Sequence, residues 1–166
     1  MNDKFSLESF QINQELVLIQ MEANSVTEVI TQLSAILLER GYVKSSYAEA
    51  AIAREEIFPT GLPTKGYGTA IPHADIEHTL KPGIAIGILK EPIKFGQLGD
   101  PDTKIDVSIV FLLSVTQPSA QVYLLQSLVE IYKDEDLLHK LHMASDPITI
   151  VDEVNDALQK VQTPSE

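Results

Sequence analysis

The chain of 166 residues contains no cysteine and no tryptophan. Without cysteine it has no disulfide framework, thiol nucleophile or thiolate metal site, and a cytoplasmic protein is the simplest interpretation. No apolar run approaches the roughly 20 residues that a membrane-spanning helix needs, so we expect no direct membrane insertion. Residues 1–6 lack a basic segment followed by an apolar one, which excludes a secretory signal at that position.

Positive charge is scarce, because 12 lysines and arginines stand against 24 aspartates and glutamates, for a net charge of −12. Nucleic acid and anionic lipid would both be repelled by such a chain, which argues against a nucleic-acid partner. Basic protein partners remain compatible with this charge. The alternative is that the acidic excess only maintains solubility.

Several catalytic motifs are also absent. The sequence has no G-x-S-x-G nucleophile elbow, no P-loop and no H-E-x-x-H zinc helix. Gly66-Tyr67-Gly68 resembles a phosphate-binding loop, but it lacks the later glycine and precedes a predicted strand instead of a helix. A turn with close backbone packing explains this triplet better.

What is present is an ordinary globular composition, with 44% apolar and 22% charged residues in a chain of one-domain length. Short apolar runs predict strands, and apolar residues at helical spacing predict helices. The expected strands are 15–21, 70–71, 83–89, 93–95 and 105–113, and the expected helices are 25–40, 47–56, 119–132, 134–142 and 147–161. Segment 96–104 holds glycines and turn formers, so we expect a surface loop there.

The order of these elements predicts an α/β (α+β) fold in a single domain. The strand 105–113 is too apolar to leave one face in water, so we expect a mixed sheet of four to five strands covered by helices on both faces. The domain is expected to span 14–161, between a flexible N-terminal segment at 1–13 and a C-terminal tail at 162–166.

Local signals mark where the helices begin and end. Ser25 with Glu28, and Ser46 with Glu49, match the capping box at two helix starts. Gly41 is expected to end the first helix. The pair Asp146-Pro147 has the pattern of an N-cap followed by a first-turn proline and opens the last helix.

The candidate for chemistry is His73, which follows directly on Pro72. Proline fixes φ, removes a backbone donor and pushes Ile71 into an extended conformation, so the strand should end there. The imidazole of His73 would then sit on a rigid backbone at a strand end, well oriented and open to solvent. Arg54 and Thr60 lie upstream and could converge on it.

Two other interpretations of the histidines remain open. If the segment after Pro72 were extended, His73, Asp75 and Glu77 would face one way and could hold a metal ion. A metal-dependent hydrolase using His73, Asp75 and His78 is therefore an alternative function. His73 could also be a buried strand-end residue without chemistry.

The remaining two histidines lie three residues apart on a short acidic segment. His139 and His142 would share one side of the predicted helix 134–142. They are expected to face solvent near the C-terminal end of that helix.

A neutral histidine at a strand end can accept a phosphoryl group without a general base, because one ring nitrogen already carries a free lone pair. The other nitrogen needs an acceptor that fixes the tautomer. A guanidinium and a few donors around the transferring oxygens would supply the electrostatic stabilisation.

These residues carry a resemblance. The segment 51–62, Ala-Ile-Ala-Arg-Glu-Glu-Ile-Phe-Pro-Thr-Gly-Leu, followed by 68–73, Gly-Thr-Ala-Ile-Pro-His, resembles the enzyme IIA domains of the bacterial phosphoenolpyruvate-dependent sugar phosphotransferase system, fructose and mannitol class. The resemblance covers about residues 14–160. It implies an enzyme, a phosphotransferase that carries phosphohistidine without a cofactor or metal.

The resemblance also implies roles for particular residues. His73 would be the phosphoryl acceptor through Nε2, Arg54 would stabilise the phosphate charge, and Thr60 would be an auxiliary donor. The donor partner would be the histidine-containing phosphocarrier protein, and the acceptor partner an enzyme IIB.

One position departs from the pattern of the family. Many members carry a second histidine before a set of leucines, and Leu124, Leu125 and Leu128 place Gln121 there. Glutamine can donate a hydrogen bond to phosphate but cannot carry a proton or a positive charge. Together with Phe-Pro-Thr-Gly after the arginine, Gln121 is most similar to the galactitol branch. A regulatory sensor of phosphorylation state on the same fold is a further alternative.

Overall fold

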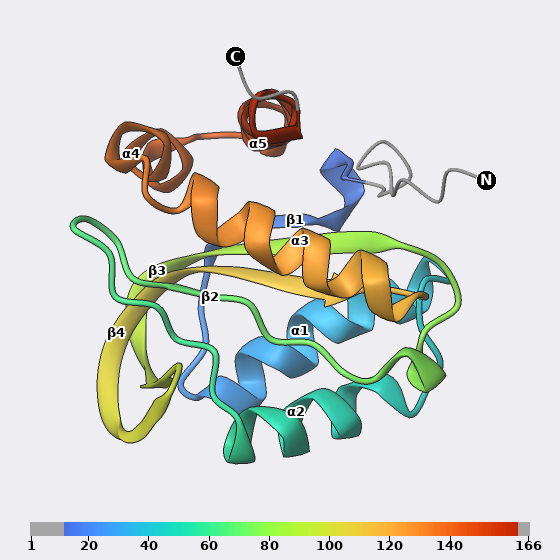
Figure 1. Ribbon diagram of the computed structural model, residues 1–166. Coiled ribbons are helices and arrows are strands. Elements are labelled where there is room, and N and C mark those ends of the chain that lie inside the picture. The colour runs from blue at the N-terminus through green and yellow to red at the C-terminus, as the bar shows by residue number, and fades with distance from the viewer. Residues whose placement is uncertain (1–11, 163–166) are drawn as a thin grey trace.

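The computed structural model describes residues 12–162, and within this range the chain forms one mixed sheet with helices on both sides (Figure 1). The sheet has four strands in the order β1-β3-β4-β2. The strands are β1 (Val17–Met21), β2 (Thr69–Ala70), β3 (Gly83–Gln97) and β4 (Asp100–Ser114). The two central strands are antiparallel, and each outer strand runs parallel to its neighbour. The predicted fold class is confirmed.

Strands β3 and β4 form the centre because their side chains are apolar on both faces. Ile84, Ile86 and Ile88 enter the core on one side of the sheet, whereas Ala85 and Leu89 enter the core on the other side. This alternation follows from the period of two in an extended chain. The continuous apolar run therefore belongs to a strand covered on both faces, as the sequence indicated.

Helices supply the cover for each core. Helices α1 (Val26–Glu39) and α2 (Tyr47–Ile57) pack on one face. Helices α3 (Pro118–Ile131), α4 (Glu135–Met143) and α5 (Pro147–Gln162) pack on the other, and Figure 1 shows the two groups on opposite sides of the sheet. All five expected helices are present in the described part of the chain.

The prediction of a surface loop at 96–104 is wrong. Strand β3 continues to Gln97 and β4 starts at Asp100, so only Leu98 and Gly99 form the turn of a long hairpin. Gly99 has a φ of +79°, which suits a tight turn. The polar residues 100–104 are exposed, and an exposed strand tolerates residues that otherwise indicate a loop. The short strand expected at 93–95 is part of β3.

The helix-start signals have mixed outcomes. The side chain of Ser25 accepts a hydrogen bond from Glu28 N at 3.1 Å, and Gly41 has a φ of +81° just beyond α1. Asp146 accepts a hydrogen bond from Thr149 N at 2.8 Å, as expected for an N-cap. The second capping box is wrong, because Ser46 makes no side-chain cap, and its Oγ lies 2.8 Å from His78 Nδ1 instead.

The described residues begin at Ile12, inside the segment 1–13 that was expected to be flexible. The prediction of a flexible segment at 1–13 lies mostly outside the described residues, because residues 1–11 are not described. The same holds for the predicted tail at 162–166, of which 163–166 are not described. Asn13 caps a short 3₁₀ turn, Gln14–Leu16, that occupies the first two positions of the predicted strand 15–21. Ile12 is 9% exposed and belongs to a hydrophobic core.

The short strand β2 brings the candidate site to the edge of the sheet. A Cβ atom placed on Gly68 would overlap the carbonyl oxygen of Asp106 on β4, so only glycine allows this approach. Beyond β2, Leu113 N donates to the Pro72 carbonyl at 3.1 Å, and His73 forms a parallel bridge with Leu113. The predicted close backbone packing in the Gly66-Tyr67-Gly68 triplet is therefore confirmed at Gly68.

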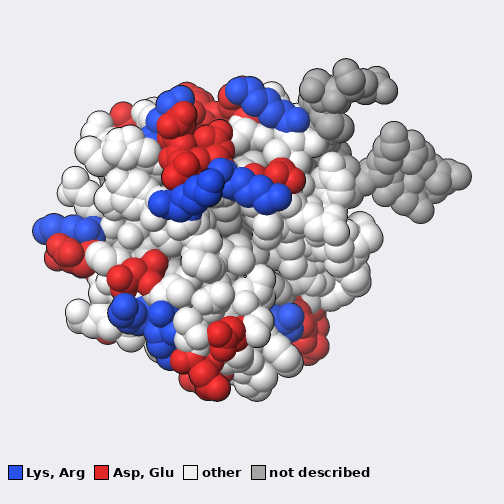
Figure 2. Space-filling model, turned by 60° about the vertical axis from the view of Figure 1, so that its left-hand side comes forward, with Lys and Arg blue, Asp and Glu red and all other residues white. Residues whose placement is uncertain are grey.

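The charged side chains do not gather into one basic surface on the face shown in Figure 2, where lysines and arginines lie among aspartates and glutamates. Several charged side chains form ion pairs. Lys140 Nζ lies 4.0 Å from Glu153 Oε1, and Lys160 Nζ lies 3.1 Å from Asp156 Oδ2. Among the described helices, none combines the length and apolar character that crossing a membrane requires.

Candidate functional site

The imidazole of His73 is held by the backbone two residues before it. Its Nδ1–H donates a hydrogen bond to the Ile71 carbonyl oxygen at 3.0 Å, because a carbonyl can only accept. This bond selects the tautomer with a lone pair on Nε2. Nε2 makes no hydrogen bond to the described residues.

The ring is less exposed than the sequence suggested. His73 is only 6% exposed, so the expectation of a solvent-open imidazole is corrected to a buried one that lines a pocket. Burial is the main cause that lowers the pKa of His73, and the neighbouring Arg54 charge acts in the same direction. The bond to Ile71 and the charge of Asp75 partly oppose this shift. The ring is therefore neutral at physiological pH.

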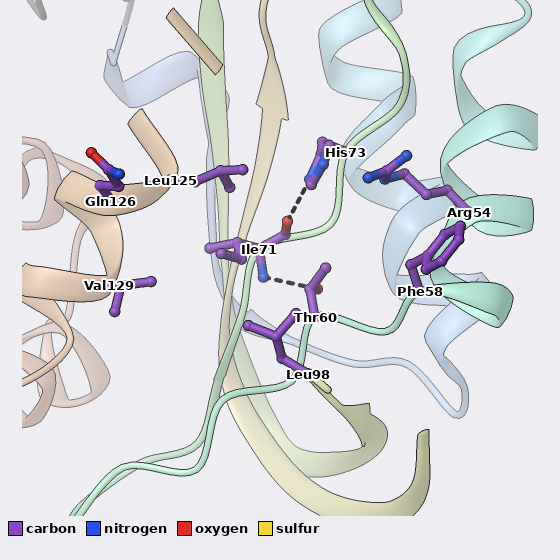
Figure 3. A pocket seen from close by; sticks show the side chains of 9 residues that line it. All are labelled: Arg54, Phe58, Thr60, Ile71, His73, Leu98, Leu125, Gln126 and Val129. Atoms are coloured by element: carbon purple, nitrogen blue, oxygen red, sulfur yellow. Dashed lines mark hydrogen bonds between the residues drawn. The ribbon is translucent and has the colours of Figure 1, made fainter. Parts of the chain in front are cut away.

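A pocket of about 410 Å³ lies over His73 (Figure 3). Helix α2 and the segment after it form one side, the segment around His73 forms the floor, and α3 forms the other side. Its lining residues are mostly apolar: Arg54, Phe58, Thr60, Ile71, His73, Leu98, Leu125, Gln126 and Val129. The pocket therefore holds one cation, Arg54, beside one neutral ring, His73.

Arg54 comes from the last turn of α2, and Figure 3 shows its guanidinium pointing toward His73. Its Nη1 lies 3.5 Å from Asp75 Oδ1, and its Cζ lies 5.5 Å from the centre of the Phe58 ring. The buried Nε has no hydrogen-bond partner among the described residues. Arg54 thus keeps donors for an anion in the pocket, as an arginine that binds phosphate would.

Thr60 lines the same pocket, but its hydroxyl is already engaged. Its Oγ1–H donates to the Glu55 carboxylate, at 2.9 Å to Oε1 and 3.2 Å to Oε2. The same oxygen accepts a hydrogen bond from Ile71 N at 3.1 Å. In this structure the hydroxyl proton of Thr60, the residue expected to be an auxiliary donor, is therefore directed at Glu55.

Glu55 is a residue near the site to which sequence analysis gave no role. It is 6% exposed and also accepts a hydrogen bond from Thr60 N at 2.7 Å. Burial raises the pKa of Glu55 to about 7, against the opposing effects of the Thr60 hydrogen bonds and of Arg54. One signal could have found it: Tyr47, Ala51 and Glu55 recur every four residues and form the buried stripe of α2.

Gln121 lies in the first turns of α3 and is half-buried. It is not among the residues that line the pocket, whereas Leu125, one turn further along the same side of α3, is. Gln126, which the sequence analysis did not name, also lines the pocket, and Figure 3 shows its amide turned away from His73.

The residues of the alternative metal site are engaged elsewhere. His78 Nδ1 lies 2.8 Å from Ser46 Oγ, and Asp75 pairs with Arg54. Within the described range, no group of three or more histidine, aspartate or glutamate side chains is placed to hold a metal ion. Neither of the two alternative sets, His73 with Asp75 and Glu77 or His73 with Asp75 and His78, is therefore assembled among the described residues.

His139 and His142 do not both face solvent as predicted. The ring of Tyr67 stacks on His142, with centroids 4.1 Å apart, and the Tyr67 hydroxyl lies 3.3 Å from His139 Nδ1. His142 is half-buried, and this burial together with His139 lowers the pKa of its ring. The prediction failed because residue 67, which provides the contact, is remote in sequence.

The fold is shared with solved structures of a sugar phosphotransferase component. The crystal structure of IIA mannitol from Escherichia coli matches with a TM-score of 0.71 and 26% identity, over 90% of this chain and 99% of that chain. A second structure of enzyme IIA mannitol, in complex with phosphorylated enzyme IIB mannitol, matches with a TM-score of 0.70. The fold is thus that of a phosphotransferase-system IIA protein.

The family follows from the sequence. A sequence model described as phosphoenolpyruvate-dependent sugar phosphotransferase system, EIIA 2, matches residues 10–157. The chain therefore belongs to the EIIA type 2 family and is a phosphocarrier component of that system. The resemblance drawn from the sequence is confirmed.

Two further relatives differ in the share of their own length that this chain matches. The galactitol-specific EIIA component of Escherichia coli K12 is 32% identical over 115 residues, which is 69% of this chain and 76% of that protein. The transcriptional regulator ManR of Bacillus subtilis is 40% identical over 100 residues, or 60% of this chain. The matched part is only 14% of the length of that regulator.

Proposed function

We propose that this protein accepts a phosphoryl group on Nε2 of His73 and passes it to a second protein. The observation that carries the proposal is the fixed orientation of one ring: Nδ1–H is bonded to Ile71, while Nε2 is left with its lone pair beside the Arg54 guanidinium. Such a nitrogen attacks phosphorus without first losing a proton.

In the forward step, the Nε2 lone pair forms a bond to phosphorus as the phosphorus–nitrogen bond of the donor phosphohistidine breaks. The leaving imidazole keeps the bonding electron pair. The imidazole of His73 becomes more positive, and the Ile71 carbonyl supports that charge through Nδ1–H. In the second step a cysteine thiolate or a neutral histidine of the acceptor protein forms a bond to phosphorus as the bond from phosphorus to Nε2 breaks. His73 keeps the bonding electron pair and returns to its neutral form.

Arg54 is proposed to bind the transferring oxygens. Its contact with Asp75 is 3.5 Å long and exposed to solvent, since the two side chains are 38% and 70% exposed, so a phosphate competes for the guanidinium at little cost. Thr60 is proposed to position the site through Ile71, and Gln121 is proposed to occupy the position of the second histidine that many relatives carry.

The proposed partners are the histidine-containing phosphocarrier protein as donor and an enzyme IIB as acceptor. The solved complex of enzyme IIA mannitol with phosphorylated enzyme IIB mannitol supports the second assignment. Phe58, Leu98 and Val129 line the pocket and are 60%, 48% and 36% exposed. We define these three residues as the apolar rim, a surface suited to a small transient interface.

The phosphotransferase system that this protein is proposed to serve is of the galactitol type. It is supported by the 32% identity to the galactitol-specific EIIA component and by the combination of Phe-Pro-Thr-Gly at 58–61 with Gln121. Phosphorylation of purified galactitol-type and mannitol-type enzyme IIB proteins in parallel tests it. Faster transfer to the mannitol-type protein would contradict the assignment.

A regulatory role is the second candidate, because 100 residues of this chain are 40% identical to part of a transcriptional regulator. A module of this kind would bind a partner according to the phosphorylation state of His73. Pull-down with phosphorylated and unphosphorylated protein separates the two roles, since a carrier captures transport components and a sensor captures a regulator.

The experiment that tests the proposed function is phosphorylation by a labelled phosphocarrier protein. We expect His73→Ala to abolish label incorporation, while circular dichroism shows that the fold is retained. His78→Ala serves as the matched control, because His78 lies five residues away and does not line the pocket. Labelling that persists in His73→Ala would refute the proposal.

A further inference from the structure

A chain of hydrogen bonds connects buried Glu55 to the reacting ring. The Glu55 carboxylate accepts from Thr60 N at 2.7 Å and from Thr60 Oγ1 at 2.9 Å. Thr60 Oγ1 in turn accepts from Ile71 N at 3.1 Å, and the Ile71 carbonyl accepts from His73 Nδ1 at 3.0 Å. Figure 3 shows the last two of these bonds.

We propose that Glu55 is a positioning residue for phosphoryl transfer, which sets the orientation of His73 through Thr60 and the backbone of Ile71. The proposal rests on the proposed function, because it takes His73 as the phosphoryl acceptor. Glu55 itself lies outside the pocket lining and does not touch the reacting atoms.

The geometry favours a positioning role because each link is constrained on two sides. Two hydrogen bonds from Thr60 to one carboxylate fix both its backbone and its hydroxyl rotamer. Ile71 is then held at its N–H by Thr60 and at its carbonyl by His73. Because Pro72 supplies no N–H, the chain between Ile71 and His73 offers no competing backbone donor.

The position of the Ile71 carbonyl decides which tautomer His73 adopts. If that carbonyl moves, Nδ1–H loses its acceptor, and the ring can exchange to the tautomer with its proton on Nε2. That tautomer has no lone pair where the phosphoryl group must bind. Glu55 therefore affects the reaction without contributing a charge to it.

The first test compares two changes at Thr60. Thr60→Val keeps the shape and removes the hydroxyl, and it should lower the rate of phosphoryl transfer about tenfold, the effect of one lost hydrogen bond. It should also shift the ¹⁵N NMR signals of the His73 ring toward the Nε2–H tautomer. Thr60→Ser retains the hydroxyl and should restore both the rate and the signals.

Thr69→Val is the matched control for the loss of a buried hydroxyl. Thr69 is fully buried and lies two residues before Ile71, and its Oγ1 has no hydrogen-bond partner in the described structure. Its replacement should leave both the ring signals of His73 and the rate of transfer unchanged.

The second test asks whether Glu55 acts through Thr60. Glu55→Ala should shift the His73 ring signals in the same direction as Thr60→Val, and the double variant should be no slower than the slower single variant. Fully additive rate losses, or a Thr60→Val protein with unchanged ring signals and rate, would overturn the proposal. If Glu55→Ala does not fold, the Thr60 pair decides alone.

These outcomes are distinct from a failure of the proposed function. If His73→Ala were still labelled, the assignment of His73 as the phosphoryl acceptor would be refuted, and this inference would be refuted with it. If labelling requires His73 but the Thr60 and Glu55 variants lose only thermal stability, the chain of hydrogen bonds is structural and the inference alone is refuted.

Discussion

At the scale of single residues, the site pairs a neutral ring with a permanent cation. Burial and Arg54 lower the pKa of His73, so the nucleophilic lone pair is present before any partner binds. A protonated ring would be both unreactive and repelled by Arg54. The guanidinium that adds to the effect of burial on this pKa is the group proposed to bind the incoming phosphate oxygens.

The first prediction concerns Arg54. Arg54→Gln should slow phosphoryl transfer to His73 about 10- to 100-fold, because one or more charge-assisted hydrogen bonds to the phosphate are lost. The rate is measured by rapid quench with an excess of labelled donor. Arg40→Gln is the control, since Arg40 pairs with Glu15 at the surface and should not affect the rate. Equal rates for both variants would show that Arg54 has a structural role.

Sequence analysis at this scale predicted His73 as the candidate residue, with Arg54 and Thr60 near it, and the structure places all three in one pocket. Pro72 and the motif around it identified His73, because their effects are local. The burial of His73 could not be predicted, because it depends on α2 and α3, which are distant in the chain. Glu55 was missed for a related reason: a charged side chain is normally exposed, and its partner Thr60 is visible only in the folded loop.

At the scale of elements, the site depends on how closely the segment before His73 approaches β4. Gly68 N-terminal to β2 lies against the Asp106 carbonyl, and its own carbonyl accepts a hydrogen bond from Ser108 N at 2.9 Å. This contact fixes the start of β2, which ends three residues before His73. The register of β2 and the position of the ring are therefore linked.

The second prediction tests this contact. Gly68→Ala should lower the free energy of unfolding by about 1–3 kcal/mol, the usual effect of forcing a methyl group into closely packed atoms. Gly66→Ala is the control, because a Cβ at Gly66 meets no atom within 4 Å. Urea denaturation monitored by circular dichroism measures both. Equal stabilities would contradict the close approach of the two backbones.

The hairpin β3–β4 shows where element prediction from sequence fails. Its inner half was recognised because buried strands are uniformly apolar. Its outer half was assigned to a loop, because Asp100, Asp102 and Lys104 are exposed and their polarity carries no strand period. This part of the sheet forms through pairing between β3 and β4, for example of Gly96 with Lys104. A few neighbouring residues of the sequence do not encode such pairing.

At the scale of the whole molecule, two cores on opposite faces of one sheet hold a site at its edge. The helices α1 and α2 cover one face and α3 to α5 cover the other, so the pocket lies where α2 and α3 approach from the two sides. The apolar rim surrounds this opening. Under the proposed function, a partner that delivers a phosphoryl group to His73 would bury this rim.

The third prediction concerns that rim. Leu98→Asp should raise the KM for the phosphorylated donor about tenfold, because a charge replaces an apolar contact at the interface. The maximal rate should change less, since Leu98 does not touch the reacting nitrogen. Ile148→Asp is the control: Ile148 lies on α5, is 54% exposed and does not line the pocket. Identical KM values would place the interface elsewhere.

The central claim is that the phosphoryl group is carried on Nε2 of His73. ³¹P and ¹H–¹⁵N NMR of the ¹⁵N-histidine-labelled protein, phosphorylated by its donor, test it most directly. We expect phosphorus coupling to the Nε2 of one histidine, the signal that is missing from His73→Ala, with Nδ1 still protonated. Coupling to Nδ1, or phosphate on any other residue, would contradict the account.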